Sequence, residues 1–194
     1  MSIQININAF YDSLSVAHKL DNFLDGFKRE EIHLFCYFSA FLSHYKGNPA
    51  EDWDYGFIVS TMDGFPHSKS IDDAIERHIN VGAFEIRGSF LSITSRGTDE
   101  YKNFIELSNL KKREEFIDAA CNTSILIPYK ETEYALLNDI NIQKARSIQN
   151  DSWVDFQYEN LKTISTSLGA SLDDLTISAI TWIRLLIIQI ENKN

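Results

Sequence analysis

The stretch Ala83-Phe-Glu-Ile-Arg-Gly-Ser-Phe-Leu-Ser-Ile-Thr-Ser-Arg-Gly97 decides the fold of this chain. Two short apolar segments, Ala83–Ile86 and Phe90–Thr94, flank Arg87-Gly-Ser89, and a short loop that contains glycine is typical of an antiparallel hairpin. The threonine near the end of the stretch is placed to cap a helix, and the final glycine permits a tight turn from strand into helix. We therefore predict a β-hairpin that leads directly into a helix.

The segments before the hairpin have helical and short-strand patterns. Apolar residues cover nearly the whole circumference of a helix expected over Lys28–Lys46, which predicts a central, buried element. Gly56–Ser60 has the β-branched content of a short strand, and Ser68–Asn80 has helical spacing that Gly82 ends. Helix, strand, helix, hairpin and helix form the order of a winged helix-turn-helix with Arg87-Gly-Ser89 as the wing tip. A generic hairpin inserted among helices is the alternative.

The remaining segments complete a mainly α fold with one small β-hairpin. We expect an amphipathic helix over Ala9–Asp25 with Gly26 as its C-cap, and a helix over Thr98–Phe116 after the hairpin. Ile125–Tyr129 should be extended, because a proline disfavours helix at the residue before it. Further helices are expected over Glu133–Ile148, from Trp153 to Gly169, and after Asp174. This order predicts an N-terminal helix in residues 1–27, a winged-helix-like domain in 28–122 and a helical C-terminal region in 123–194.

Charge argues against a general nucleic-acid coat. The 18 basic and 28 acidic side chains give a formal net charge of −10, whereas such coats need a basic surface to displace counterions from phosphate. The expected recognition helix, Ser68–Asn80, also has a net charge of −1, because two basic side chains face three acidic ones. If this chain touches DNA, the residues we expect to contact it are Lys69, Arg77, Arg87 and Arg96.

Composition indicates an ordinary globular protein of the cytoplasm. Hydrophobic residues make up 44% of the chain, far from the composition of disordered segments. The two cysteines, Cys36 and Cys121, lie in apolar helical stretches, which favours buried, reduced thiols over a disulfide framework. The beginning of the sequence lacks a signal-peptide pattern. The longest apolar run, Leu175–Ile190, is shorter than the ~20 residues that a membrane span requires, so we expect no membrane contact.

The last helix is unusually apolar. Isoleucines at 180, 183, 187 and 190 form a short heptad-like seam, and most other positions of this helix are also apolar. Such a helix must be buried, either by its own domain or by another subunit. Both possibilities remain open on the sequence alone. For the second, the residues we expect at a protein interface are Trp182, Leu186, Ile187 and Ile190.

We find no catalytic motif in the sequence. The histidines lack the spacing of a zinc protease or a zinc finger, and the glycines are too dispersed for a phosphate-binding loop. His33 and Cys36 lie one turn apart, but inside the most apolar helix, where a core role is the more common one. The sequence therefore predicts no enzyme, no metal site and no cofactor.

The order of elements from Glu31 onwards resembles a family of small subunits. The segments that carry the resemblance are the wing ending Ile93-Thr-Ser-Arg-Gly97, Leu126-Ile-Pro-Tyr129 and the following Glu133-Tyr-Ala-Leu-Leu-Asn-Asp139. They are similar to the winged-helix middle components of bacterial ABC-three-component systems, which include Lamassu-type anti-phage systems. The resemblance implies a non-catalytic accessory subunit that binds an SMC-like ATPase and an effector subunit. The alternative is a winged-helix transcription regulator or antitoxin that binds DNA as a homodimer.

Overall fold

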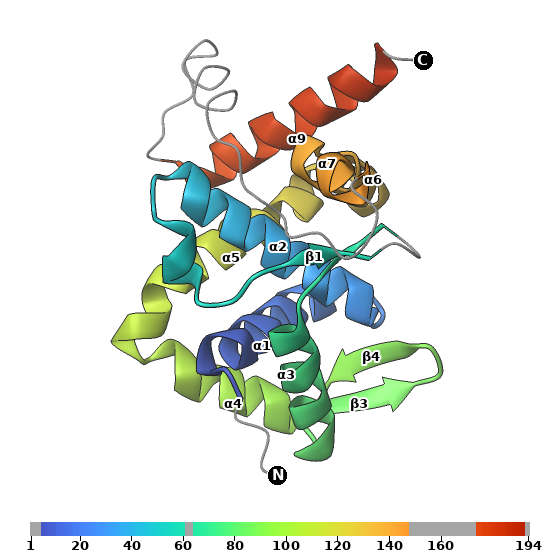
Figure 1. The fold of residues 1–194 in the computed structure, drawn as a ribbon. Helices are drawn as coiled ribbons and strands as arrows, with labels where there is room; N and C mark the ends of the chain where they lie inside the picture. Colours follow the sequence, from blue (N-terminus) through green and yellow to red (C-terminus); the bar gives the residue numbers. More distant parts are fainter. Residues whose placement is uncertain (1–4, 61–63, 148–173, 193–194) are drawn as a thin grey trace.

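Figure 1 shows a computed structural model of the chain, which describes residues 5–60, 64–147 and 174–192. The fold is mainly helical. The helical elements, in chain order, are α1 (Ile7–Asp21), α2 (Arg29–Tyr45), the 3₁₀ turn η1 (Ala50–Trp53), α3 (Lys69–Asn80), α4 (Ser95–Ile105), α5 (Ser108–Leu126), α6 (Tyr129–Leu137), α7 (Ile140–Ser147) and α9 (Leu175–Glu191). The strands form two antiparallel pairs: β1 (Ile58–Val59) with β2 (Pro66–His67), and β3 (Phe84–Arg87) with β4 (Phe90–Ile93).

The predicted hairpin is confirmed. β3 and β4 pair from Phe84 opposite Ile93 to Arg87 opposite Phe90, which leaves a loop of two residues. The first loop residue, Gly88, has φ +64°, a conformation that suits glycine in a tight hairpin turn. The hairpin projects from the helical body beside α3 (Figure 1). The fold class predicted from the sequence, mainly α with a small hairpin, is therefore confirmed at this level.

The turn from hairpin to helix also forms as expected. The Thr94 side chain accepts a hydrogen bond from the Gly97 amide at 3.2 Å and caps α4. Gly97 is needed for a different reason from the one the sequence indicated. A Cβ at this position would lie 2.4 Å from the Ala83 carbonyl oxygen, so close backbone packing, rather than an unusual φ, favours glycine here.

Phe27 forms an isolated antiparallel bridge with Leu91, on the edge of β4 that does not face β3. The Phe27 amide donates to the Leu91 carbonyl at 2.9 Å, and the Leu91 amide donates to the Phe27 carbonyl at 2.8 Å. The short strand expected within Gly56–Ser60 does form, but it pairs with β2 rather than with the hairpin. The residue beside the hairpin is thus Phe27, which is followed by Lys28, the N-cap of α2.

Several predicted helix ends are wrong. α1 ends at Asp21 with Asn22 as its C-cap, and Gly26 instead has φ +92° in the turn before Phe27. The helix expected over Thr98–Phe116 is two helices, because Leu107 is extended and starts α5.

Two further predictions after α5 need correction. Ile125 and Leu126 are helical, so the extended segment before α6 is limited to Ile127 and Pro128. The single helix expected over Glu133–Ile148 is divided into α6 and α7, because the Asp139 side chain accepts from the Asn141 amide at 2.8 Å and begins a new helix. The helix expected from Trp153 to Gly169 lies outside the described residues. At the last helix, Asp174 is the N-cap, and its side chain accepts from the Thr176 and Ile177 amides.

One hydrophobic core connects the N-terminal and C-terminal helices. α2 is buried along nearly its whole length, as its sequence predicts. α5 packs against α1, α2, α4, α6 and α9, and residues of all these helices belong to the same cluster of buried side chains. The expected boundary between residues 122 and 123 falls inside α5. Within the described part of the chain, no helix has the combined length and hydropathy needed to cross a bilayer.

α1 and α5 are joined by a buried ion pair. The Arg113 Nε donates to Asp12 Oδ1 at 2.8 Å, and the same guanidinium donates a second hydrogen bond to Asp12 Oδ2. The guanidinium carbon lies 3.9 Å from the centre of the Trp53 ring, and the Tyr55 hydroxyl donates to Asp12 at 2.5 Å. Asp12 is fully buried and Arg113 nearly so, so each charge depends on these partners.

The next residue of α5 makes a second polar contact with α1. The Glu114 carboxylate accepts hydrogen bonds from Ser15 at 2.7 Å, from Tyr101 of α4 at 2.6 Å, and from Tyr11. Lys19 forms an ion pair with the same carboxylate at 2.5 Å. Burial raises the pKa of Glu114, but the Lys19 charge and these hydrogen bonds outweigh it and lower the pKa overall.

We predict that Asp12→Ala strongly destabilises the fold. The substitution leaves the Arg113 guanidinium buried without its carboxylate, a loss that costs about 3–5 kcal/mol for buried pairs. The measurement is the free energy of unfolding by urea. Asp21→Ala, which removes an exposed carboxylate from the same helix, should change this free energy by less than about 0.5 kcal/mol. Equal effects of the two substitutions would contradict the role given to the ion pair.

We predict that Gly97→Ala lowers the free energy of unfolding by about 1–3 kcal/mol, the usual cost of overpacking. The added methyl group would collide with the Ala83 carbonyl and force the hairpin away from α4. Arg96→Ala at the neighbouring exposed position is the control and should be close to neutral. Thermal or urea unfolding of both variants tests this, and a neutral Gly97→Ala would show that the hairpin and α4 pack less closely.

Candidate functional site

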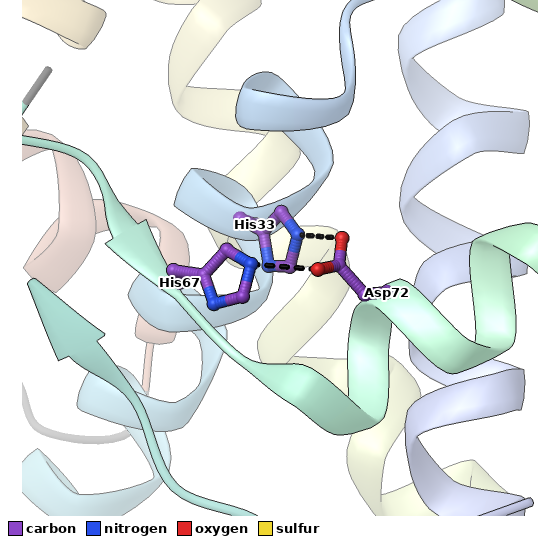
Figure 2. Close-up of side chains that lie close together, drawn as sticks. All are labelled: His33, His67 and Asp72. Carbon is purple, nitrogen blue, oxygen red and sulfur yellow. Dashed lines mark hydrogen bonds and ion pairs between the residues drawn. The ribbon is translucent and has the colours of Figure 1, made fainter. Parts of the chain in front are cut away.

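Three polar side chains from different elements meet beside the N-terminus of α3. His33 of α2, His67 of β2 and Asp72 in the first turns of α3 point toward one another (Figure 2). His33 Nε2 lies 3.0 Å from Asp72 Oδ1, and His67 Nε2 lies 2.6 Å from Asp72 Oδ2. The two imidazole rings are stacked, with their centroids 4.7 Å apart. The Asp72 carboxylate therefore bridges two histidines. We call His33, His67 and Asp72 the histidine–aspartate cluster.

The local structure explains why these residues meet. β1 and β2 pair through Ile58 opposite His67, which holds His67 next to the start of α3. Ser68 occupies the N-cap position of α3, and Asp72 follows one turn later on the same helix. α2 packs against β2, so a histidine near the beginning of α2 can reach both.

The backbone amide of Ser68 identifies the proton on His33. This amide donates to His33 Nδ1 at 3.2 Å, so Nδ1 provides a lone pair and the proton of the neutral ring is on Nε2. His33 Nε2 then donates to Asp72. Because an ionised carboxylate only accepts, His67 Nε2 is also a donor to Asp72.

Electrostatics favours a neutral His33 beside an ionised Asp72. Burial lowers the pKa of His33, although the hydrogen bond to Asp72 opposes this. Burial raises the pKa of Asp72, but the hydrogen bonds from the two histidines outweigh it and lower the pKa to about 2. The His33 side chain is only 4% exposed, whereas those of His67 and Asp72 are 38% and 37% exposed. The cluster is thus closed on one side and open to solvent on the other.

The histidine–aspartate cluster contains the ligand types of a transition-metal site. Imidazole and carboxylate suit zinc, iron and related ions, and two histidines with one carboxylate form a known three-ligand set. The sequence analysis missed this group. Its only sequence signal is the short spacing from His67 to Asp72, because His33 joins through a contact between distant segments.

The four residues expected to contact DNA lie at the surface around α3 and the hairpin. Lys69 is exposed but binds Asp73 one turn later, with both oxygens 3.0 Å from Nζ. Arg87 next to the hairpin turn forms an ion pair with Glu85 on the same strand. Arg77 and Arg96 are exposed and make no ion pair with any described residue. Two of these four basic side chains are therefore paired with carboxylates of the same chain.

The residues expected at a protein interface divide into two groups. Trp182 and Leu186 are buried in the chain's own core, and Trp182 stacks on Phe41 of α2 with ring centroids 5.4 Å apart. These two side chains fix α9 to the domain and leave no surface for a partner. Ile187 and Ile190 are partly exposed at the C-terminal end of α9, next to Ile188, which is 51% exposed.

The cysteines are core residues. Cys36 and Cys121 are both fully buried and unpaired with each other. Burial is the largest cause that raises the pKa of each thiol, so neither provides a thiolate near neutral pH. The expectation that Cys36 packs in the core is met, and the neighbouring His33 points to Asp72 instead.

The histidine of α3, His78, is separate from the histidine–aspartate cluster. It is fully buried against α1, where its Nε2 donates to the Phe10 carbonyl at 3.0 Å. Its Nδ1 has no hydrogen-bond partner, so protonation would place a charge in an apolar site. Burial accordingly lowers the pKa of His78 to about 4, although the Phe10 carbonyl opposes this.

We predict that His78 makes the fold sensitive to acid. The unfolded state binds a proton at His78 below about pH 6.5 and the folded state only below about pH 4, so stability falls as the pH decreases through this window. The linkage amounts to about 3 kcal/mol between pH 7 and pH 4. Urea unfolding at several pH values should show that His78→Gln removes this part of the pH dependence, whatever its effect at pH 7. An unchanged slope would contradict the prediction.

No protein-family model, curated protein or solved structure matches this chain.

Proposed function

We propose that the chain is a non-catalytic, protein-binding subunit built on a winged-helix core. In this assignment, α1 is the first helix, Phe27 is the short first strand, α2 and α3 are the second and third helices, and β3–β4 is the wing. The paired hydrogen bonds between Phe27 and Leu91 support the assignment, because a first strand beside the wing is what this topology requires. It moves the start of the core from residue 28, as expected from the sequence, to α1.

The proposed function rests on the charges of α3, whose basic side chains are balanced by acidic ones. In a winged helix that reads DNA, the third helix presents basic and amide side chains to bases and phosphates. Here Lys69 is bound by Asp73, and Glu76 forms an ion pair with Arg29 of α2 at 2.6 Å. The face that would meet DNA therefore carries acidic groups as well as basic ones. Such a face suits a protein-pairing module better than a groove reader.

The partner follows from the family resemblance. The similarity to ABC-three-component middle subunits suggests an SMC-like ATPase and an effector, in a bacterial cytoplasmic anti-phage complex. The partly exposed end of α9, formed by Ile187, Ile188 and Ile190, is the surface we assign to such a partner. It lies at the opposite end of the molecule from the hairpin (Figure 1), so an interface there would leave α3 and the wing uncovered.

We predict that the purified chain binds duplex DNA only weakly. The acidic side chains on α3 and the net charge of −10 leave few phosphate contacts, so the Kd should be in the non-specific range of about 10⁻⁴–10⁻⁶ M at physiological salt, or weaker. Fluorescence anisotropy with random and genomic duplexes measures it. Sequence-selective nanomolar binding that is lost in Arg77→Ala and Arg96→Ala would instead support the homodimeric regulator or antitoxin.

We predict that Ile188→Asp disrupts binding to an SMC-like ATPase while the fold remains intact. A carboxylate in the apolar centre of an interface loses the hydrophobic contact and is desolvated without a partner. The test is co-purification of a tagged chain with the ATPase from the native host, together with thermal unfolding of the isolated chain. Gln189→Asp adds the same charge at the next exposed position and is the control. Retention of the ATPase by Ile188→Asp would place the interface elsewhere.

A further inference from the structure

We propose that His33, His67 and Asp72 form a binding site for one divalent transition-metal ion, for which Zn²⁺ is the ion to test. The nitrogen and oxygen atoms that these three residues offer all lie within 4.8 Å of one another. Zinc–ligand bonds of about 2.0–2.1 Å in a tetrahedral arrangement separate neighbouring ligand atoms by about 3.3 Å. The Nε2–oxygen distances of 3.0 Å and 2.6 Å are already close to that value, so small movements admit an ion.

The surroundings suit an accessible ion with an open coordination position. His33 forms the buried wall of the histidine–aspartate cluster, whereas His67 and Asp72 are each more than one third exposed at the side chain. An ion can therefore enter from solvent between His67 and Asp72. The described residues provide three ligands, and water fills the remaining position, as in sites where zinc keeps one place free.

Binding requires a specific change at Ser68. The ion takes the lone pair of His33 Nε2, so the proton now on that nitrogen must move to Nδ1. Nδ1 currently accepts the Ser68 amide at 3.2 Å, and two donors cannot share that contact. The Ser68 amide must turn away. Ser68 makes no side-chain cap to α3, so the start of the helix has room to adjust without losing such a bond.

The ion would also join three separate elements of the fold. His33 belongs to α2, His67 to β2 and Asp72 to α3. An ion that binds the folded state but not the unfolded state stabilises the fold by an amount that rises with the logarithm of its concentration above the Kd. Metal binding is thus expected to raise the melting temperature and to move the N-terminal turn of α3.

The first experiment measures metal binding to the full chain, prepared without a polyhistidine tag and stripped with EDTA. Titration with Co²⁺ should give the visible absorption of a histidine-ligated ion with one equivalent per chain, and Zn²⁺ should displace it. Asp72→Asn removes a ligand. Loss of a residue that only supports a metal ligand weakens binding by about 10–100-fold, so loss of the ligand itself should weaken it by no less than this. Asp73→Asn removes the same charge from the next residue and should bind like the wild type.

The second experiment follows the Ser68 amide by NMR during the Zn²⁺ titration. Its resonance should shift in step with metal binding in the wild type and in Asp73→Asn, and should not shift in Asp72→Asn. Failure of the folded wild type to bind Co²⁺ or Zn²⁺ at millimolar concentration overturns the proposal. Equal affinities of Asp72→Asn and Asp73→Asn, or an unshifted Ser68 amide at saturation, also overturn it. None of these outcomes depends on DNA or partner binding, so the proposed function is tested separately.

Discussion

The ion pair between Asp12 and Arg113 determines how the two halves of the core fit together. Removing both charges from water costs several kcal/mol per ion, and the pair is tolerated only because hydrogen bonds and the Trp53 ring complete its surroundings. Besides the helices that both contact, α1 packs against α3 and β4, and α5 packs against α6 and α9. The orientation of α1 on α5 therefore fixes where the hairpin and α3 lie relative to the C-terminal helices. A displaced α1 would move both ends of the molecule.

This polar contact also shows where sequence patterns fail. In α1 the apolar spacing predicts a helix correctly, and the opposite face would ordinarily be exposed to water. Asp12, Ser15 and Lys19 lie on that face, at helical spacing, and meet charged or polar groups of α5. Their partners are almost a hundred residues away, and periodicity within one helix contains no information about them. By contrast, the buried α2 and the hairpin depend on local patterns and were predicted correctly.

The histidine–aspartate cluster was missed for a related reason. Its histidine on α2 lies within an apolar helix, where a core role is the usual one, and the pairing of β1 with β2 that brings His67 to it is only two residues long in each strand. For α9, composition correctly indicated burial, but not which surface buries it. The stacking of Trp182 on Phe41 answers that question, and only the tertiary structure could supply it. The four basic residues lie at the surface, and the acidic partners of Lys69 and Arg87 change what that surface offers.

The continuous run of α5 through residue 122 limits how this protein can exchange parts during evolution. Recombination usually succeeds where few contacts cross the junction. A crossover in the middle of α5 would join half of a helix to a foreign partner while α1, α2 and α9 all still require its packing surface. We therefore expect α9 to be inherited together with the hairpin. Variation between lineages should accumulate in exposed turns such as Gly88–Ser89, where insertions leave the shared core untouched.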